Sequence, residues 1–358
     1  MRIYAITIKP QSPFGTPLKG DTIFGQFCWQ IAGHGGILSK GLDHWIACYH
    51  ERPFAVFSSA WPKIDDQGGF VAIRRPELPL SFLGEPDPSA DCETRLKNRK
   101  HNKGKRWLVV DKDLRVRLFW ENMLSDKDIY TRIVATLPEA DNKRLRLADD
   151  RHRRPLSQAE QQHNSINRLT QTTGKGEFAP YVTDNSYYLP GLELVIFAGL
   201  ADEACGPDAL WEGFTLMGQW GFGRDASTGL GRFSVTGVEE LGFAAGAAEN
   251  NACLSLGPCV PEQDFWEAIY FTPFTRFGRH GAALLHTGKP FKNPVVMADE
   301  GAVFVPPPGK FPKNPYIGRA VGNISKAQPE AVCQGYSLFL PMRMPVQDNG
   351  GHHGSTDR

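Results

Sequence analysis

A glycine-rich loop is the segment of this sequence best suited to chemistry. It runs from Gln219 to Arg232 and has glycines at positions 221, 223, 229 and 231. Glycine reaches positive φ and lets a ligand approach the main chain, so exposed amides in such a loop can form a nest for an anion. Arg224 and Arg232 add charge-assisted hydrogen bonds to phosphate. The loop predicts a contact with a nucleic-acid backbone; a mobile turn is the alternative on spacing alone.

The order of the expected elements excludes two other uses of glycine. A dinucleotide-binding fingerprint follows a strand and opens a helix. This loop instead follows the helix expected from Pro207 and opens the strand expected over Phe233–Val238. A Walker loop requires Gly-Lys-Ser/Thr, whereas Gly288-Lys289-Pro290 has proline at the hydroxyl position. Dinucleotide and ATP binding are therefore not expected.

Other expected elements that position the loop have clear hydrophobic patterns. Arg2–Lys9 alternates as a strand that is covered on both faces. A helix is expected near Asp21, whose carboxylate can accept hydrogen bonds from the first helical amides. Leu192–Leu200 is apolar enough for a central strand, and Pro207 opens a second amphipathic helix. With two strands in the middle, this order fits the βαββαβ ferredoxin-like unit.

The middle of the chain does not follow this unit. Residues from about 52 to 91 are rich in proline and short β-prone runs, which indicates an irregular insertion. Arg95–Arg106 has many cations and no carboxylate, which predicts a mobile, exposed loop. This loop either guides RNA electrostatically or is only solvated surface. Ser165–Thr170 and Phe178–Thr183 are expected to be strands of a hairpin with its tip at residues 173–176.

The expected fold class is α+β, with two ferredoxin-like (RRM-like) domains and, in the first, a large irregular insertion and a protruding β-hairpin. Ala268–Phe271 and Tyr336–Leu340 are expected to be the first and last strands of the second domain. The expected boundaries are 1–243 for the first domain, with its insertion at about 52–160 and its hairpin at about 163–184, then 244–262 for a linker, 263–345 for the second domain and 346–358 for a disordered tail.

Composition predicts a folded protein without a strong global attraction to nucleic acid. Of the 358 residues, 41% are hydrophobic, and the formal net charge is +1. A nucleic-acid site therefore has to come from local segregation of positive charge. The seven scattered cysteines do not form the paired framework of a secreted disulfide protein, and neither a signal peptide nor a membrane-spanning apolar run is recognisable. We expect a cytoplasmic protein with no membrane partner.

Candidate metal ligands do not form a convincing cluster. His44, Cys48 and His50 are close in sequence, but no second pair follows at zinc-finger spacing. Neither Asp21 nor Asp225 lies beside a second acidic residue that would indicate a metal pair. Asp225 is expected to brace the glycine loop, either by pairing with Arg224 or by accepting hydrogen bonds from main-chain amides. No metal site and no cofactor are expected.

Four segments, in order along the chain, resemble the RAMP superfamily. The stretch Gly221–Phe233 is similar to the glycine-rich loop between the second helix and fourth strand in members from Csm complexes. Pro17–Gly25, His163–Thr170 and Cys333–Pro341 agree with the same family. Together the segments most resemble the fourth-subunit family of type III-A (Csm) CRISPR effector complexes, which belongs to the fifth Cas group.

This resemblance implies a non-catalytic subunit that binds the repeat-derived 5′ handle of the crRNA. Its implied partners are the large polymerase-like Csm subunit and the adjacent backbone RAMP subunit. The glycine loop and the start of the first helix are expected to face the handle, and the hairpin Asn167–Tyr181 resembles the thumb that presses on a neighbouring guide segment. The expected RNA-binding residues are Lys19, Gly20, Thr22, Asn167, Arg168, Gly221, Phe222, Gly223, Arg224, Ser227, Thr228, Gly229, Gly231 and Arg232.

Aromatic residues near the expected groove have two interpretations. A single-stranded handle is recognised through phosphates and through splayed bases that stack on aromatic rings. Trp220, Phe222 and Tyr181 could each contribute about 1–3 kcal/mol by stacking. An aromatic side chain beside a sheet is more often part of the core.

Two alternatives within the superfamily remain open. One is a metal-independent repeat-RNA endonuclease with His34 as its general acid or base, although Gly33, Gly35 and Gly36 around it indicate a flexible turn rather than a preorganised site. The other is the equivalent subunit of a type III-B (Cmr) complex. Neither alternative requires a cofactor.

Overall fold

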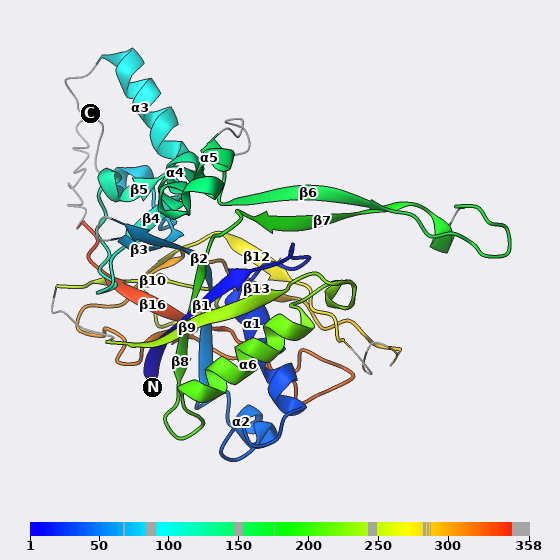
Figure 1. Ribbon diagram of the computed structural model, residues 1–358. Helices are drawn as coiled ribbons and strands as arrows, with labels where there is room; N and C mark the ends of the chain where they lie inside the picture. Colours follow the sequence, from blue (N-terminus) through cyan, green and yellow to red (C-terminus); the bar gives the residue numbers. More distant parts are fainter. Residues whose placement is uncertain are drawn as a thin grey trace, which may run out of the picture.

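The structure is a computed structural model with a seven-stranded antiparallel sheet at its centre (Figure 1). The strand order is β5-β4-β3-β2-β8-β1-β9, and a five-stranded sheet with the order β11-β14-β10-β16-β15 lies beside it. The expected α+β class with antiparallel sheets is confirmed. The structure describes residues 1–66, 69–83, 91–146, 153–174, 176–242, 249–281, 284, 286 and 288–345.

The central sheet is built around its most apolar strands. Every residue of β8 is buried, and β1 is buried on both faces over most of its length, as their apolar sequences predict. β8 lies between β1 and β2 in the sheet. The strands of this sheet are β1 (Arg2–Pro10), β2 (Ala55–Asp66), β3 (Gly69–Arg74), β4 (Trp107–Val110), β5 (Met123–Leu124), β8 (Leu194–Leu200) and β9 (Phe233–Leu241).

Two helices pack against this sheet and against each other. α1 (Gly20–Ala32) packs against β2, and α6 (Pro207–Trp220) packs against β9. The rings of Phe27 in α1, Phe214 in α6 and Phe57 in β2 form a buried triangle with centroid separations of 5.1, 6.0 and 5.6 Å. Both expected helices are therefore present. The short helix α2 (Leu42–Ala47) follows α1.

The expectation of an irregular insertion from about residue 52 is wrong for β2 and β3. Both strands belong to the central sheet, and β2 pairs directly with β8. The register of β2 shifts between Phe57 and Ala60, and the strand contains Pro62. Proline interrupts a strand pattern because it cannot donate to the ladder, so the sequence of β2 resembles a loop.

The basic stretch Arg95–Arg106 is mainly a helix, not the expected loop. α3 (Cys92–Gly104) begins after Asp91, whose carboxylate accepts from the Thr94 amide at 2.6 Å. The expectation of exposure is correct, since none of its residues is buried. The remaining helical segments of this region are η1 (Leu80–Leu83), η2 (Trp120–Asn122), α4 (Asp126–Thr136) and α5 (Glu139–Arg146).

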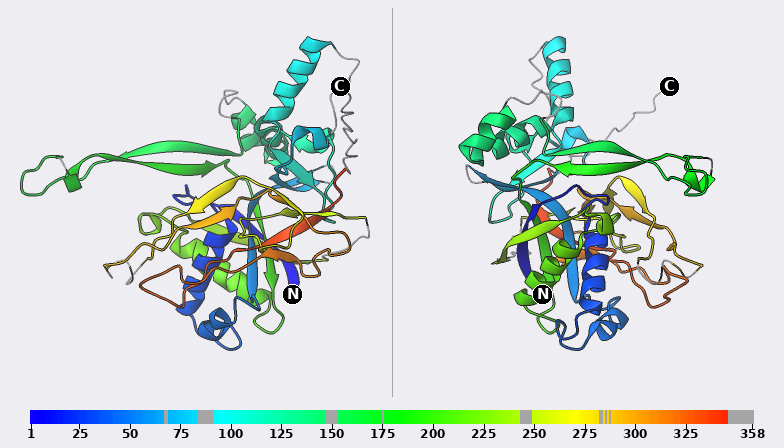
Figure 2. Two further views of the ribbon diagram at one scale, coloured as in Figure 1. Left: turned by 180° about the vertical axis from the view of Figure 1, so that it is seen from behind. Right: turned by 45° about the vertical axis from the view of Figure 1, so that its right-hand side comes forward.

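The expected hairpin is present as a long two-stranded ribbon that projects from the body (Figures 1 and 2). We call β6 (Leu156–His163) and β7 (Tyr181–Tyr188) the ribbon; they pair from Leu156 with Tyr188 to His163 with Tyr181. The expected strand at 165–170 is wrong, because these residues and η4 (Gly176–Phe178) belong to the tip. Nearly all residues of β6 are exposed, so its sequence is polar and lacks the apolar alternation that predicts a strand.

The second sheet begins earlier in the chain than expected. β10 (Ala252–Ser255) precedes β11 (Ala268–Tyr270), so β11 is not the first strand of this region, whereas β16 (Tyr336–Met342) is the last described one. The others are β14 (Val303–Val305) and β15 (Tyr316–Gly318), with β12 (Pro273–Arg276) and β13 (Val295–Ala298) as a separate pair. Residues 244–248 of the expected linker and the tail from residue 346 lie outside the described residues. The linker expectation is wrong for residues 252–255, which form β10.

Side-chain contacts join the second sheet to the first. Gln334 is completely buried; its Oε1 accepts from the Phe57 amide at 2.9 Å, and its Nε2 donates to the Phe57 carbonyl at 2.8 Å. The Tyr336 hydroxyl donates to the His50 carbonyl at 2.7 Å. One hydrophobic core includes buried residues of both sheets. Among the described residues, no helix is long and apolar enough to span a membrane.

Candidate nucleic-acid interface

The glycine loop, residues 221–232, joins α6 to β9 and closes tightly on itself. Gly221 and Gly231 have φ values of 91° and 72°, and the Phe222 amide donates to the Gly231 carbonyl at 2.9 Å. A Cβ on Gly231 would lie 2.2 Å from the Phe222 carbonyl oxygen, and one on Gly221 would lie 2.5 Å from the Leu230 carbonyl oxygen. Glycine is required at both positions, for its positive φ and for the close approach of the two arms.

Gly231→Ala is expected to lower the free energy of unfolding by about 3 kcal/mol, because the new methyl group would overlap backbone atoms at a positive φ. Gly229 provides the matched control: its φ is 97°, and an added Cβ would meet nothing within 4 Å. Gly229→Ala should therefore cost only about 1–2 kcal/mol of backbone strain. Denaturant unfolding of both variants measures the difference, and equal losses would contradict the packing argument.

The connector between β1 and α1 holds the glycine loop from one side. This connector accepts hydrogen bonds from three loop amides. Its Thr16 side chain also fills the space beside Gly223, where an added Cβ would lie 2.5 Å from Thr16 Oγ1. The loop is therefore fixed by this connector. The three hydrogen bonds join the amides of Arg224 to Thr16 Oγ1 (2.9 Å), Gly231 to the Pro13 carbonyl (2.7 Å) and Arg232 to Ser12 Oγ (2.8 Å).

One arc of the glycine loop has unused amides. In the described part of the chain, the amides of Asp225, Ala226 and Ser227 donate to no acceptor. The backbone of Asp225 is in the left-handed helical conformation (φ 60°, ψ 24°), and Asp225 precedes the 3₁₀ turn η5 (Ala226–Thr228). Consecutive open amides next to a left-handed residue form an anion-binding concavity. The Asp225 carboxylate is partly neutralised by Arg224, whose Nε lies 3.4 Å away, as expected from the sequence.

The two loop arginines also have structural contacts. Arg224 Nη2 donates to the Asp184 carbonyl at 2.5 Å and to Asn185 Oδ1 at 3.2 Å, which connects the glycine loop to β7 near the base of the ribbon. Arg232 Nη1 donates to the Gln219 carbonyl in the last turn of α6. Both arginines are exposed residues.

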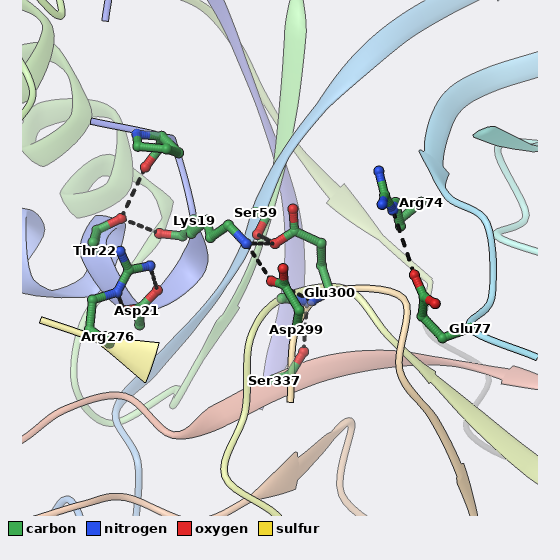
Figure 3. A network of polar contacts seen from close by, with 12 residues as sticks. Lys19, Asp21, Thr22, Ser59, Arg74, Glu77, Arg276, Asp299, Glu300 and Ser337 are labelled. Carbon is green, nitrogen blue, oxygen red and sulfur yellow. Dashed lines mark hydrogen bonds and ion pairs between the residues drawn. The ribbon is translucent and has the colours of Figure 1, made fainter. Parts of the chain in front are cut away.

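The start of α1 is a buried polar junction (Figure 3). Lys19 Nζ pairs with Asp299 and lies 3.1 Å from Glu300 Oε2, and only 18% of its side chain is exposed. A Cβ on Gly20 would lie 2.3 Å from the Phe57 carbonyl oxygen. The expected role of Lys19 and Gly20 at an RNA surface does not fit these contacts, since both residues are used in packing α1 against other elements.

Asp21 is not the helix cap that its position predicts. Lys19 precedes the first helical residue without a side-chain cap, and Asp21 accepts from Arg276 instead, at 2.6 Å from Nε and 2.9 Å from Nη2 (Figure 3). Thr22 Oγ1 donates to the Lys19 carbonyl at 2.7 Å. The polar residues at the start of α1 therefore hold the helix to β12 and to the turn before β14.

The base of the ribbon adjoins the glycine loop, and its tip does not. Phe14 of the connector and Ser186 of β7 exchange two backbone hydrogen bonds of 2.9 Å each. Asn167 and Arg168 lie in the tip, beyond the eight residues of β6. At about 3.4 Å per residue, roughly 27 Å of ribbon separates them from the base. His163 and Tyr181 stack at the outer end with ring centroids 5.0 Å apart.

No protein-family model matches the chain, and no curated protein matches its sequence. Solved structures match it over nearly its whole length. A Csm3-Csm4 subcomplex of a type III-A CRISPR-Cas interference complex matches with a TM-score of 0.55 and 16% identity, over 96% of this chain and 100% of the other. Csm1-Csm4 cassettes in complex with cA4 and with AMPPNP match with TM-scores of 0.53 and 0.51, identities of 14% and 15%, and in each case 97% and 100% coverage.

Csm4 is the component that these assemblies share. The chain has the Csm4 fold. On this fold, the RNA-binding residues expected from the sequence fall in three separate places: the glycine loop, the start of α1 and the tip of the ribbon. Phe222 is only 1% exposed and packs near Phe14, so its ring belongs to the core. Trp220, the last residue of α6, is 67% exposed, and Tyr181, at the outer end of the paired ribbon strands, is 52% exposed.

Sequence reasoning missed the residues that fix the glycine loop in this Csm4 fold. Ser12 and Thr16 each accept a loop amide, and Phe14 pairs with the ribbon base. The sequence shows only a Pro-Phe-Gly turn between two hydroxyl residues. This pattern predicts a turn but does not predict which segment the turn contacts. Arg276 was also missed, because its partner Asp21 is 255 residues away in sequence.

The residues considered for catalysis or metal binding do not gather at this interface. His34 follows the far end of α1, about 20 Å of helix from its start. Its Nδ1 lies 2.8 Å from the Gln30 carbonyl oxygen. Among the described residues, no group of three His, Cys, Asp or Glu side chains could hold a metal ion.

Proposed function

We propose that this chain is the Csm4 subunit of a type III-A CRISPR effector complex and holds the 5′ handle of the crRNA without cutting it. The observation that carries the proposal is the match of nearly the whole chain to Csm4 in the Csm3-Csm4 subcomplex. The open arc at Asp225–Ser227 supports the RNA contact, because exposed amides beside arginines suit phosphate. The one carboxylate of this arc, on Asp225, lies 3.4 Å from Arg224 Nε, and a carboxylate held by a cation suits a binding role.

The partners follow from the same likeness. Csm4 has been solved together with Csm1 and with Csm3, and we infer that this chain contacts the corresponding large polymerase-like subunit and the adjacent backbone RAMP subunit in the cytoplasm. We also propose that its two sheets represent two ferredoxin-like domains, at about 1–243 and, because β10 belongs to the second sheet, at about 252–345 rather than 263–345. The burial of β16 against β2 implies that these two parts act as one body.

Two of the three places, the glycine loop and the tip of the ribbon, have a proposed RNA contact. The handle backbone binds the amides of Asp225–Ser227, with Arg232 and the exposed hydroxyls of Ser227 and Thr228 beside them. Trp220 stacks on a handle base. Asn167 and Arg168 at the ribbon tip contact a more distant guide segment, because the tip is too far from the glycine loop to share a nucleotide with it.

Ser227→Asp tests the site by placing a carboxylate at the open amides. We expect at least about a tenfold loss of handle binding, because the new charge repels the phosphate that the arc would hold. Ser227→Asn is the matched control, since it has nearly the same shape without the charge. Ser227 is exposed and lies within the surface turn η5, so neither variant should disturb the fold.

The measurement is nuclease protection of the 5′ handle in a complex reconstituted from this chain, its Csm1 and Csm3 partners and crRNA. Protection should fall with Ser227→Asp and persist with Ser227→Asn. Equal protection in both variants would show that the Asp225–Ser227 arc does not contact the handle. Failure of the wild-type chain to join the complex would overturn the proposed function itself.

A further inference from the structure

Helix α3 stands clear of the rest of the molecule (Figures 1 and 2). None of its residues is buried. Its C-terminal end is fixed to the body, since Arg75 Nη1 donates to the carbonyls of Asn102 at 3.0 Å and of Lys105 at 2.7 Å. The helix is therefore a projection that is held firmly at one end.

One side of α3 has a stripe of positive charge. Arg95, Arg99 and Lys103 recur every four residues, and Lys100 lies beside them at helical spacing. In the described part of the chain, these four side chains form no hydrogen bond or ion pair. Glu93, the one carboxylate within the helix, pairs with Lys97 at 2.7 Å. We call Arg95, Arg99, Lys100 and Lys103 the α3 stripe.

The α3 stripe is an unfavourable arrangement for a helix in water. Like charges four residues apart destabilise a helix, and α3 gains little from tertiary packing because it buries no side chain. An anionic partner would turn this repulsion into attraction. The arrangement therefore indicates a surface whose favourable state includes a bound polyanion.

We propose that the α3 stripe binds the phosphate backbone of an RNA strand, as a surface separate from the handle site. A nucleic-acid backbone suits it better than an acidic protein does. Protein interfaces have an apolar centre and are depleted in lysine, whereas the only large apolar side chain exposed on α3 is Leu96. The views in Figures 1 and 2 place α3 on one side of the ribbon, and α6 and β9, which the glycine loop joins, on the other.

The test is binding of the full chain to a fluorescein-labelled oligouridine of thirty nucleotides, which has no handle sequence, at several salt concentrations. The triple variant Arg95→Gln, Arg99→Gln and Lys103→Gln removes three cations and keeps good helix formers. We expect affinity at low salt to fall about 10- to 100-fold, and the slope of log K against log salt to decrease in magnitude by about 2. The control Lys112→Gln, Lys310→Gln and Lys313→Gln removes the same charge from exposed positions elsewhere.

Helix content and unfolding temperature show whether the triple variant still folds; both should be maintained or increased, because repulsion is relieved. A second variant, Arg95→Lys with Arg99→Lys, keeps the charge and should keep most of the affinity. Unchanged affinity and slope in the triple variant would overturn the proposal. Loss of polyglutamate binding with unchanged oligouridine binding would also overturn it and assign the stripe to an acidic protein. Handle protection in the assembled complex is a separate readout, so this proposal and the proposed function can fail independently.

Discussion

Arg276→Met should lower the free energy of unfolding by about 3–5 kcal/mol, since it leaves a buried carboxylate without its cation. Only 2% of the Asp21 side chain is exposed, and Arg276 is its bidentate partner at 2.6 and 2.9 Å. The pair joins α1 to β12. Denaturant unfolding of the variant and the wild-type chain under identical conditions measures the loss.

Two further variants separate burial from charge. Arg343→Met removes an exposed partner of Glu249, at 3.5 Å with 72% and 76% side-chain exposure, and should cost no more than about 1 kcal/mol. Asp21→Leu combined with Arg276→Met should regain much of the loss, because no buried charge remains unpaired. A loss for Arg276→Met as small as that for Arg343→Met would show that Asp21 is not held by this pair.

Lys19→Met should have a similarly large effect, about 3–5 kcal/mol at pH 8, because two carboxylates then share a buried site without a cation. Asp299 and Glu300 both contact Lys19 Nζ, and Ser59 Oγ donates to Glu300 at 3.2 Å. The control Lys143→Met breaks the exposed pair with Glu139 and should cost about 0.5 kcal/mol or less.

The loss caused by Lys19→Met should depend on pH in a defined direction. Burial favours the protonated form of both carboxyls. In Asp299 the hydrogen bond and charge of Lys19 outweigh burial and lower the pKa, whereas in Glu300 burial dominates and raises it. Because its folded pKa is lowered, Asp299 stabilises the fold at pH values above its unfolded pKa, and this stability is lost as pH falls through the folded pKa. Because its folded pKa is raised, Glu300 stabilises the fold below its unfolded pKa, and this stability is lost as pH rises through the folded pKa.

Removing Lys19 takes away the charge that lowers both pKa values. Both carboxyls of the variant should then bind protons more tightly in the folded state, so the loss should grow as pH rises above about 4. Unfolding measured from pH 4 to pH 8 should show the gap between wild type and variant widening with pH. A gap that is constant over this range would mean that Lys19 acts through packing alone.

The elements next to the glycine loop could be predicted because their local patterns agree with their burial. β8 is apolar throughout and central, and α6 has its apolar face on the sheet. β2 could not be predicted, because Pro62 and the register shift interrupt its alternation. α3 has no apolar periodicity, since it buries nothing. Its composition therefore predicted exposure correctly and conformation wrongly.

The candidate site was predictable only where its residues are local in sequence. The glycines and the Arg224–Asp225 contact lie within one loop, so their conformational roles follow from residue type. The partners of Lys19 and Asp21 are 280 and 255 residues away, and no local pattern predicts a contact over such distances. Capping was therefore the best local explanation for Asp21, although a tertiary ion pair uses its carboxylate instead.

The contact between Gln334 and the main chain of Phe57 has a consequence for synthesis on the ribosome. The Gln334 amide occupies both the N–H and the C=O of Phe57, at a point where β2 departs from a regular ladder, and the two residues are 277 positions apart. Buried backbone groups need partners. At about 5–20 residues per second, the ribosome adds Gln334 many seconds after Phe57, so these buried backbone groups of β2 receive their partner only long after β2 itself has been synthesised.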